Sequence, residues 1–189
     1  MYIDPVVYTG RPAEKRADKE ERCYELLDSL HIEYARVDHD CADTIEACRE
    51  IEKLLGCEIC KNLFLTNRRM TELWLLLMPG DKPFRTRLLS RQIGSARLSF
   101  ATPEQMLEVL DITPGSVSVL GLMNDKENRA RLLVDRDLLS QTYIGMHPCL
   151  NSTSLRVRTS DLFEKLIPAM GHEPTFVDLP RDPDQADDS

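Results

Sequence analysis

Apolar and polar positions follow two periods along the chain, and these periods divide it into interspersed helices and strands. Apolar residues that recur every three to four positions, together with capping residues, predict helices over residues 14–30, 44–55, 82–92, 106–110 and 159–170. Short apolar or alternating runs predict strands over residues 33–37, 59–66, 72–78, 116–119, 130–134, the end of 146–157, and 175–179.

The element boundaries carry their own signals. Asp43 or Thr44 is a side-chain cap for the second helix, and Gly56 ends it. Thr102-Pro-Glu-Gln105 is a capping box with proline at the first helical position. An Asn-Arg-Arg turn separates the strands at 59–66 and 72–78, so we expect these two strands to form a hairpin.

The order of these elements predicts the fold class. Helices and strands are interspersed, and several consecutive strands have hairpin spacing. We therefore expect an α+β fold, with a mixed β barrel-like sheet surrounded by helices. The length of 189 residues suits one domain, which we expect over residues 1–180. Residues 181–189 are acidic, and we expect a mobile tail there.

The segment from Thr113 to Asn128 has the most unusual composition. A Thr-Pro-Gly turn precedes Ser116-Val-Ser-Val119, whose alternation is typical of a half-buried strand. Gly115 allows a ligand to approach the main chain closely, and backbone N–H groups at the rim of such a strand can hold an anion or a polarised carbonyl. The alternative is a tight turn that leads into a core strand.

Composition predicts an ordinary soluble protein, with 42% hydrophobic and 30% charged residues. The longest apolar run, Leu73–Met78, is too short to span a membrane. The first residues, Met1-Tyr-Ile-Asp-Pro5, have neither the basic start nor the apolar block of a signal peptide. We therefore expect a cytoplasmic protein without a membrane partner.

The chain has six cysteines, which a cytoplasmic protein keeps mostly reduced. Cys57 and Cys60 have the spacing of a redox or zinc pair, but no second pair of that spacing exists. Buried thiols without a special role are the favoured interpretation, and we expect no metal.

Charge is distributed unevenly along the chain. The net charge of −8 argues against indiscriminate binding of nucleic acids, and we expect no DNA partner. Residues 61–97 nevertheless hold eight basic and two acidic side chains, a net charge of +6. This segment is either a phosphate-binding face or the solvated surface of a helix.

Two polar residues lie at positions where a polar side chain is unusual unless it has a structural or functional role. Lys61 begins an apolar strand, where it either protects a sheet edge or has a functional role. His147 precedes Pro148, and a histidine with satisfied hydrogen bonds in a loop is the common alternative to a functional one. Asn151 and Ser152 are either turn formers or part of the same site.

Several motifs in a fixed order then suggest a family. They are Ile59-Cys-Lys-Asn-Leu-Phe-Leu65, Phe100-Ala-Thr-Pro-Glu104, Thr113-Pro-Gly-Ser-Val-Ser118, Gly121-Leu-Met-Asn-Asp-Lys-Glu-Asn128, His147-Pro148 with Asn151, and Gly171-His-Glu-Pro174. Over roughly residues 12–179 the chain resembles the YbaK/ProX aminoacyl-tRNA deacylases, the free-standing relatives of the editing insertion of prolyl-tRNA synthetase. The resemblance is to the ProX branch, which hydrolyses alanine wrongly attached to tRNA(Pro).

The resemblance implies a cytoplasmic trans-editing hydrolase with no cofactor, no metal and no protein nucleophile. Its substrate is the ester between an amino acid and the terminal ribose of tRNA. Lys61, Gly115 and His147 match the catalytic positions of the family: the lysine holds the terminal phosphate or ribose, the glycine backbone lies at the ester, and the histidine shapes or polarises the pocket. The resemblance further implies six substrate-binding residues, Asn62, Ser116, Val117, Ser118, Val119 and Asn128.

The implied partner is mischarged tRNA(Pro), with prolyl-tRNA synthetase as a further candidate. The basic residues expected to contact the acceptor stem are Arg68, Arg69, Arg85 and Arg91.

One position departs from the family pattern, because Val119 stands where the glycine loop usually ends in proline. Proline fixes the backbone, so we expect valine to loosen the loop. This departure leaves two alternatives open: a deacylase for another small amino acid such as cysteine, or a protein of the same fold that binds aminoacyl-tRNA without hydrolysing it.

Overall fold

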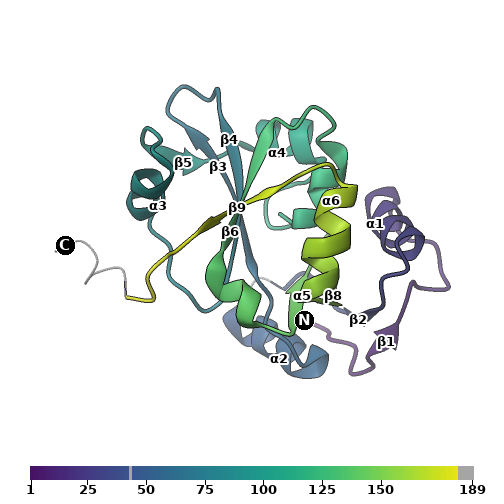
Figure 1. Cartoon of the computed structure of the whole chain (residues 1–189). Coiled ribbons are helices and arrows are strands. Elements are labelled where there is room, and N and C mark those ends of the chain that lie inside the picture. The colour runs from purple at the N-terminus through teal and green to yellow at the C-terminus, as the bar shows by residue number, and fades with distance from the viewer. Residues whose placement is uncertain (43, 183–189) are drawn as a thin grey trace.

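The computed structural model describes residues 1–42 and 44–182. Its strands form two sheets with helices around them (Figure 1). The four-stranded sheet has the order β1-β2-β8-β7 and is antiparallel throughout. The five-stranded sheet has the order β5-β3-β4-β6-β9 and combines antiparallel pairs with the parallel pairs β4–β6 and β6–β9. This mixed α+β architecture confirms the predicted fold class.

The elements of the described residues have the following bounds. The helices are α1 (Asp18–Ser29), α2 (Ile45–Leu55), α3 (Thr86–Ile93), α4 (Pro103–Leu110) and a last helix made of α5 (Thr159–Asp161), the π turn η3 (Leu162–Leu166) and α6 (Ile167–Ala169), with the 3-10 turns η1 (Val119–Asn124) and η2 (Arg136–Ser140). The strands are β1 (Tyr8–Thr9), β2 (Tyr34–Asp38), β3 (Lys61–Asn67), β4 (Leu73–Met78), β5 (Leu98–Phe100), β6 (Ala130–Asp135), β7 (Tyr143–Met146), β8 (Thr153–Arg158) and β9 (Pro174–Val177).

Local chemistry sets several boundaries where the sequence predicted them. Thr44 caps α2 by accepting a hydrogen bond from the Ala47 N–H, and Gly56 ends the helix in the left-handed conformation. Thr102 and Gln105 form the predicted capping box of α4. The predicted hairpin is present as the antiparallel pair β3–β4.

Three predicted elements were wrong in type or extent. Residues 116–119 are not a strand but an irregular segment that leads into η1, because the Ser118 hydroxyl caps that turn by accepting from the Leu120 N–H. The predicted helix at 82–92 begins only at Thr86, because Lys82 is buried at the end of the turn that follows β4. The first helix likewise begins at Asp18 rather than at residue 14.

The five-stranded sheet separates two apolar clusters because successive side chains of a strand face opposite sides. On β3, Phe64 belongs to the larger cluster, which includes residues of both sheets, of α1 and of α4, whereas Leu65 belongs to the cluster under α3. A third cluster forms where Ile51 and Leu55 of α2 pack against β2. The sheet is therefore covered on both faces.

The two sheets meet at Gly145. Its N–H donates to the Glu58 carbonyl at 2.8 Å, and its carbonyl accepts from the Cys60 N–H at 3.0 Å. A Cβ atom at Gly145 would lie 2.9 Å from the Glu58 carbonyl oxygen, so a side chain there would displace the backbone. This contact sets the start of β3 beside the end of β7.

Within the described residues, no helix combines the length and apolarity that crossing a membrane requires. The expected mobile tail begins at residue 181, and residues 183–189 lie outside the part of the chain that the structure describes.

Candidate active site

Lys61 lies at the first position of β3, directly after the junction of the two sheets. Its side chain is partly buried, and Nζ donates a hydrogen bond to the main-chain carbonyl of Lys82 at 2.6 Å. Opposite Lys61 stands Met78, the last residue of β4. The loop that follows β4 therefore provides the acceptor that holds the lysine ammonium.

Lys61 also lines a pocket of about 410 Å³ between α2 and the β3–β4 end of the sheet. This size is within the range of small-molecule sites, about 300–1,000 Å³. The remaining lining residues come from the α2 region, from the segment before β3 and from the turn after β4: Ala42, Thr44, Ile45, Cys48, Arg49, Glu52, Glu58, Ile59, Cys60, Gly80 and Asp81.

Sequence reasoning missed the α2 wall of this pocket. The available signal was Ile45, an apolar residue at the first position of a helix, which is 69% exposed in the structure. Arg49 lies one turn further along the same helix and is also exposed. Together they give the pocket an apolar and a cationic wall.

Asn62 connects β3 to the glycine loop. Its Oδ1 accepts a hydrogen bond from the Val119 N–H at 2.9 Å, and its Nδ2 donates to the Cys60 carbonyl at 3.1 Å. A proline at position 119 has no N–H and could not make the first of these bonds. The loosening expected from valine therefore meets a restraint that the sequence did not indicate, since Val119 is fully buried and its N–H is held by Asn62.

The glycine loop begins with a four-residue turn. The Ser116 N–H donates to the Thr113 carbonyl at 3.1 Å, with Pro114 and Gly115 at the centre of the turn. Gly115 has a φ of 87°, as a type II turn requires at its third position. Gly115 is exposed and nothing would contact a Cβ atom there, so the turn presents its backbone to solvent.

Two buried serines tie this loop to the segment after β7. The Ser118 hydroxyl donates to the His147 carbonyl at 2.5 Å, and the Ser116 hydroxyl accepts from the Asn151 N–H at 3.2 Å. The Asn151 side chain in turn bonds the Ala42 N–H and carbonyl at 3.4 and 3.3 Å. A continuous set of hydrogen bonds therefore runs from the loop to Ala42, at the edge of the Lys61 pocket.

The ring of His147 is oriented by β8. Its Nδ1 lies 3.0 Å from the Thr153 carbonyl oxygen and must carry the proton, because two acceptors would repel each other. Nε2 is then an unprotonated acceptor. Burial holds the pKa of His147 below its ordinary value, and the neighbouring His39 acts in the same direction.

His39 and Ser154 are further polar residues that the sequence did not single out. The Ser154 hydroxyl lies 2.9 Å from His39 Nε2 and 3.4 Å from His147 Nδ1. His39 Nδ1 lies 2.7 Å from the Asp40 carbonyl oxygen, and burial lowers the pKa of His39 as well. His39 directly follows β2 and Ser154 lies on β8, and these positions far apart in sequence gave no local signal.

Hydrogen bonds bring together Asn62, the glycine loop from Gly115 to Val119, and His147. Lys61 precedes Asn62 on β3, and its ammonium contacts the loop that contains Lys82. Successive residues of a strand face opposite sides of a sheet, so these hydrogen bonds do not include the Lys61 side chain.

The structure does not bring Asn128 to these residues. Asn128 is exposed in the turn before β6. The first residue of β6 pairs with Leu73, the first residue of β4, whereas Lys61 pairs with Met78, the last residue of β4. That offset of five residues corresponds to roughly 16 Å along the sheet.

The four expected tRNA-binding arginines are all exposed but lie in two places. Arg85 and Arg91 belong to the start and the last turn of α3, whereas Arg68 and Arg69 belong to the β3–β4 turn. This turn is separated from Lys61 by the length of β3, about 20 Å.

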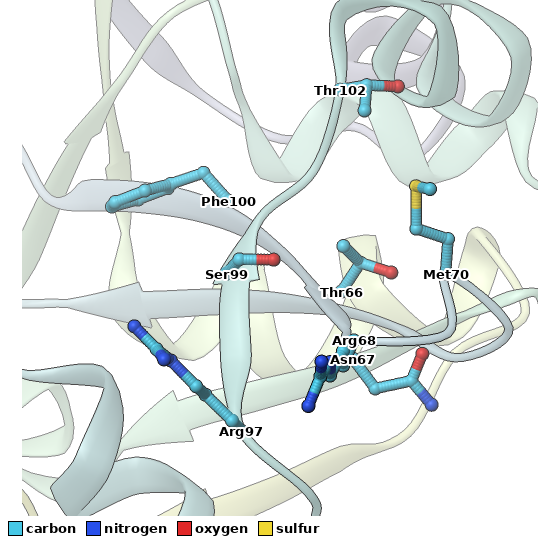
Figure 2. A pocket seen from close by; sticks show the side chains of 8 residues that line it. All are labelled: Thr66, Asn67, Arg68, Met70, Arg97, Ser99, Phe100 and Thr102. Atoms are coloured by element: carbon cyan, nitrogen blue, oxygen red, sulfur yellow. The ribbon is translucent and has the colours of Figure 1, made fainter.

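A basic hollow of about 500 Å³ lies beside this turn, lined by Thr66, Asn67, Arg68, Met70, Arg97, Ser99, Phe100 and Thr102 (Figure 2). In the described part of the chain, the side chains of Arg68 and Arg97 make no hydrogen bond or ion pair. Phe100 and Met70 are 59% and 60% exposed. The hollow therefore combines unpaired cations with accessible apolar groups.

The cysteine pair has no sign of redox or metal chemistry. Burial raises the pKa of Cys57 and of Cys60 to about 12, so both are protonated thiols at neutral pH. Among residues 1–42 and 44–182, no group of three or more His, Cys, Asp or Glu side chains is placed to hold a metal ion.

Comparison with known proteins decides the family. Residues 39–165 match the family model described as the aminoacyl-tRNA editing domain. The chain belongs to this family. The match covers more than half of the sequence, and it confirms the enzyme class that the resemblance implied, a hydrolase of the aminoacyl-tRNA deacylase type.

Two relatives of this editing-domain protein cover nearly the whole chain. The prolyl-tRNA editing protein ProX of Acetoanaerobium sticklandii is 30% identical over 162 residues, 86% of this chain and 98% of the relative. Prolyl-tRNA synthetase associated domain-containing protein 1 of Danio rerio is 28% identical over 177 residues, 93% and 95% of the two chains.

The solved structures support the same fold. A crystal structure described as a proposed trans-editing enzyme for prolyl-tRNA synthetase superposes with a TM-score of 0.63 at 17% sequence identity. The superposition covers 88% of this chain and all of the other.

The bond between Asn62 and Val119 predicts a specific pattern of stability. Asn62→Ala should lower the free energy of unfolding by about 1–3 kcal/mol, because it leaves the buried Val119 N–H without an acceptor. In a Val119→Pro background that donor is absent, so Asn62→Ala should cost clearly less. Urea unfolding of the four proteins measures this, with exposed Ser99→Ala as the control. Equal losses in both backgrounds would contradict the assigned bond.

Proposed function

We propose that this editing-domain protein is a free-standing deacylase that hydrolyses alanine from mischarged tRNA(Pro). The observation that carries the proposal is the placement of Lys61, whose ammonium is held at a pocket by the Lys82 carbonyl. The next residue, Asn62, bonds the glycine loop, and Ser118 of that loop bonds the His147 carbonyl. An aminoacyl ester is already activated, so a site that positions it and a water molecule needs neither a metal nor a covalent nucleophile. Oriented groups can supply effective molarities of about 10⁵ M or more.

In this proposal Lys61 binds the 3′ end of the tRNA. Its ammonium is a compact charge that suits the terminal phosphate or ribose oxygens. The Lys82 carbonyl, 2.6 Å away, keeps the side chain in a defined position before the substrate arrives. Arg49, which lines the same pocket, offers a second cation to this phosphate.

The glycine loop and His147 act at the ester. The open backbone of Gly115 allows the ribose and the ester to approach the main chain closely. His147 Nε2 is an acceptor, and it orients either the attacking water or the α-amino group of the substrate.

Water then adds to the ester carbonyl carbon, and the bond to the ribose oxygen breaks. The neighbouring ribose hydroxyl assists by orienting the water. The ribose oxygen leaves with a proton, and free alanine and tRNA(Pro) are the products.

Amino-acid selection follows from the shape of the pocket. In this proposal a methyl side chain lies against Ile45 and Cys48, which line the pocket, and the bulkier proline ring of correctly charged tRNA does not fit beside them once the ester is bound. Apolar contacts distinguish one methylene by only about 1–3 kcal/mol, so exclusion must be steric. Cysteine, close to alanine in size, is the competing substrate that this pocket discriminates least.

The basic hollow is the proposed contact for the body of the tRNA. Arg68 and Arg97 suit phosphates, and exposed Phe100 suits a base or ribose face. Its separation from Lys61 by the length of β3 allows one tRNA to occupy both places. Prolyl-tRNA synthetase is a further proposed partner, which would supply the mischarged tRNA.

The role of Lys61 predicts a large and specific loss of activity. Lys61→Ala should lower kcat/KM for Ala-tRNA(Pro) by about 100-fold or more, because the ester end is no longer positioned. Lys61→Arg should recover only part of it, since a planar guanidinium cannot replace a point charge held by one carbonyl. Exposed Lys53→Ala on α2 is the matched control. A Lys61→Ala enzyme with wild-type activity would refute the proposed role.

The tautomer of His147 predicts a pH dependence. Burial disfavours the charged form, so neutral His147 should persist below its ordinary pKa of about 6.5 and be lost only at lower pH. At each pH the wild-type rate constant is divided by that of His147→Gln. Ionisation of the substrate affects both rate constants equally, so it does not affect their ratio. That ratio should be constant above pH 6.5 and fall as the pH is lowered. A His147→Gln rate constant equal to the wild-type value at every pH would exclude an acceptor role for His147.

The basic hollow predicts a change in salt dependence. Replacing Arg68 and Arg97 together by Gln should reduce the slope of log affinity for tRNA against log salt by about 0.7–0.9 for each lost phosphate contact. Lys15→Gln, an 82% exposed lysine before α1, is the control and should leave the slope unchanged. An unaltered slope in the double variant would place the tRNA elsewhere.

A further inference from the structure

Lys82 is a buried cation in the loop between β4 and α3. It is only 1% exposed, and its Nζ contacts Asp135 Oδ2 at 2.7 Å and Asp137 Oδ2 at 3.0 Å. Asp135, the last residue of β6, is equally buried. Burying such a pair costs desolvation energy, and apolar residues often stabilise a protein as well or better. Stability alone is therefore a weak explanation for this cluster.

The main chain of Lys82 makes the other decisive contact. Its carbonyl oxygen accepts the hydrogen bond from Lys61 Nζ at 2.6 Å. The loop reaches this position through a turn in which the Lys82 N–H donates to the Pro79 carbonyl at 3.2 Å. A Cβ atom at Gly80 would lie 2.3 Å from the Ile59 carbonyl oxygen, so this turn packs tightly against the segment before β3.

One residue thus links the site lysine to the end of β6. The ammonium of Lys61 rests on the Lys82 carbonyl, and the Lys82 side chain is anchored by Asp135. Asp135 is itself fixed, because its Oδ1 accepts from the Asp137 N–H at 3.0 Å at the start of η2. A lysine has a long flexible side chain, and an acceptor that does not move restricts where its charge lies.

We propose that Lys82 is a positioning residue: through its buried pair with Asp135 it fixes the carbonyl that holds Lys61 Nζ in the reactive geometry. The proposal rests on the proposed role of Lys61. It assigns the buried pair to the geometry of the reaction rather than to phosphate binding, for which Lys82 is too deeply buried. It also explains how the Lys61 ammonium keeps one orientation at the pocket that Lys61 lines, although it has no carboxylate partner among the described residues.

The kinetic test uses Asp135→Asn and Lys82→Met. Asn keeps an oxygen that can accept from the Asp137 N–H but removes the charge that anchors Lys82. Both variants should lower kcat for Ala-tRNA(Pro) by about tenfold to 100-fold, the effect of a small misplacement, with KM for tRNA little changed. Lys82→Arg keeps the cation and should retain more activity than Lys82→Met.

Asp125→Asn is the matched control, because Asp125 is a buried carboxylate before the other end of β6, 3.1 Å from buried His172. It should lower stability but leave kcat unchanged well below the unfolding temperature. In a Lys61→Ala background the Asp135→Asn change should have no further effect on the residual rate, since the group it positions is gone. A kcat unaltered by Asp135→Asn, or an equal loss in both backgrounds, would overturn the proposal.

A second readout does not depend on activity. The side-chain ¹⁵Nζ relaxation of Lys61 in the full protein, assigned by its absence in Lys61→Arg, should report a rigid ammonium in the wild type and in Asp125→Asn. It should report a mobile one in Asp135→Asn and Lys82→Met. If no aminoacyl-tRNA is hydrolysed but this pattern holds, the proposed function fails and the positioning role stands. Equal mobility in all four proteins would refute the positioning role whatever the activity.

Discussion

The candidate site depends on the backbone contact at which the two sheets join. Gly145 exchanges hydrogen bonds with Glu58 and Cys60, and no side chain fits at that glycine. This contact brings the first residues of β3 next to the segment that follows β7. The segments that carry Lys61 and His147, residues separated by 86 positions in sequence, lie side by side only because the sheets meet here. Without this junction, each polar residue would stand at an unrelated strand end.

Around this junction, buried polar side chains form hydrogen bonds with backbone groups of other segments. Ser116, Ser118 and Asn151 are buried, and each bonds a backbone group of another segment. A buried polar group without a partner costs about 1–3 kcal/mol, so these contacts specify the relative positions of the loops strongly. The glycine loop, which has no regular structure before η1, is held in this way rather than by a strand ladder. Pre-organisation of this kind suits a reaction in which positioning supplies most of the catalysis.

Much of the fold follows from local patterns, whereas the site follows from long-range contacts. The helix ends at Thr44, Gly56 and Thr102 and the β3–β4 hairpin were predictable, because caps, turns and alternation act within a few residues. The alternation at residues 116–119 was misleading. Its serines alternate because they bond other segments, and not because they face solvent.

The candidate site shows the same difference between residues that local patterns indicate and residues that only long-range contacts bring in. Resemblance pointed to Lys61, Gly115 and His147, but nothing local indicated His39 or Ser154, and the α2 wall of the pocket had only apolar Ile45 as a signal. Val119 illustrates the difference best. Taken alone, it predicts a looser loop, while Asn62, 57 residues away in sequence, holds its N–H. Asn128 belongs to a motif of the same family pattern yet lies at the other end of the sheet, because β6 runs parallel to β4.

The central claim is that the protein removes alanine, a small amino acid, from tRNA(Pro) and leaves the larger proline attached. The most direct measurement is the single-turnover rate of deacylation by the wild-type protein of Ala-tRNA(Pro), Cys-tRNA(Pro) and Pro-tRNA(Pro), each aminoacylated on the same tRNA. We predict rapid loss of alanine, with Pro-tRNA(Pro) left intact. Faster loss of cysteine than of alanine would support the deacylase activity but would make Cys-tRNA(Pro) its preferred substrate. Hydrolysis of Pro-tRNA(Pro) at the alanine rate, or of none of the three, would contradict the account.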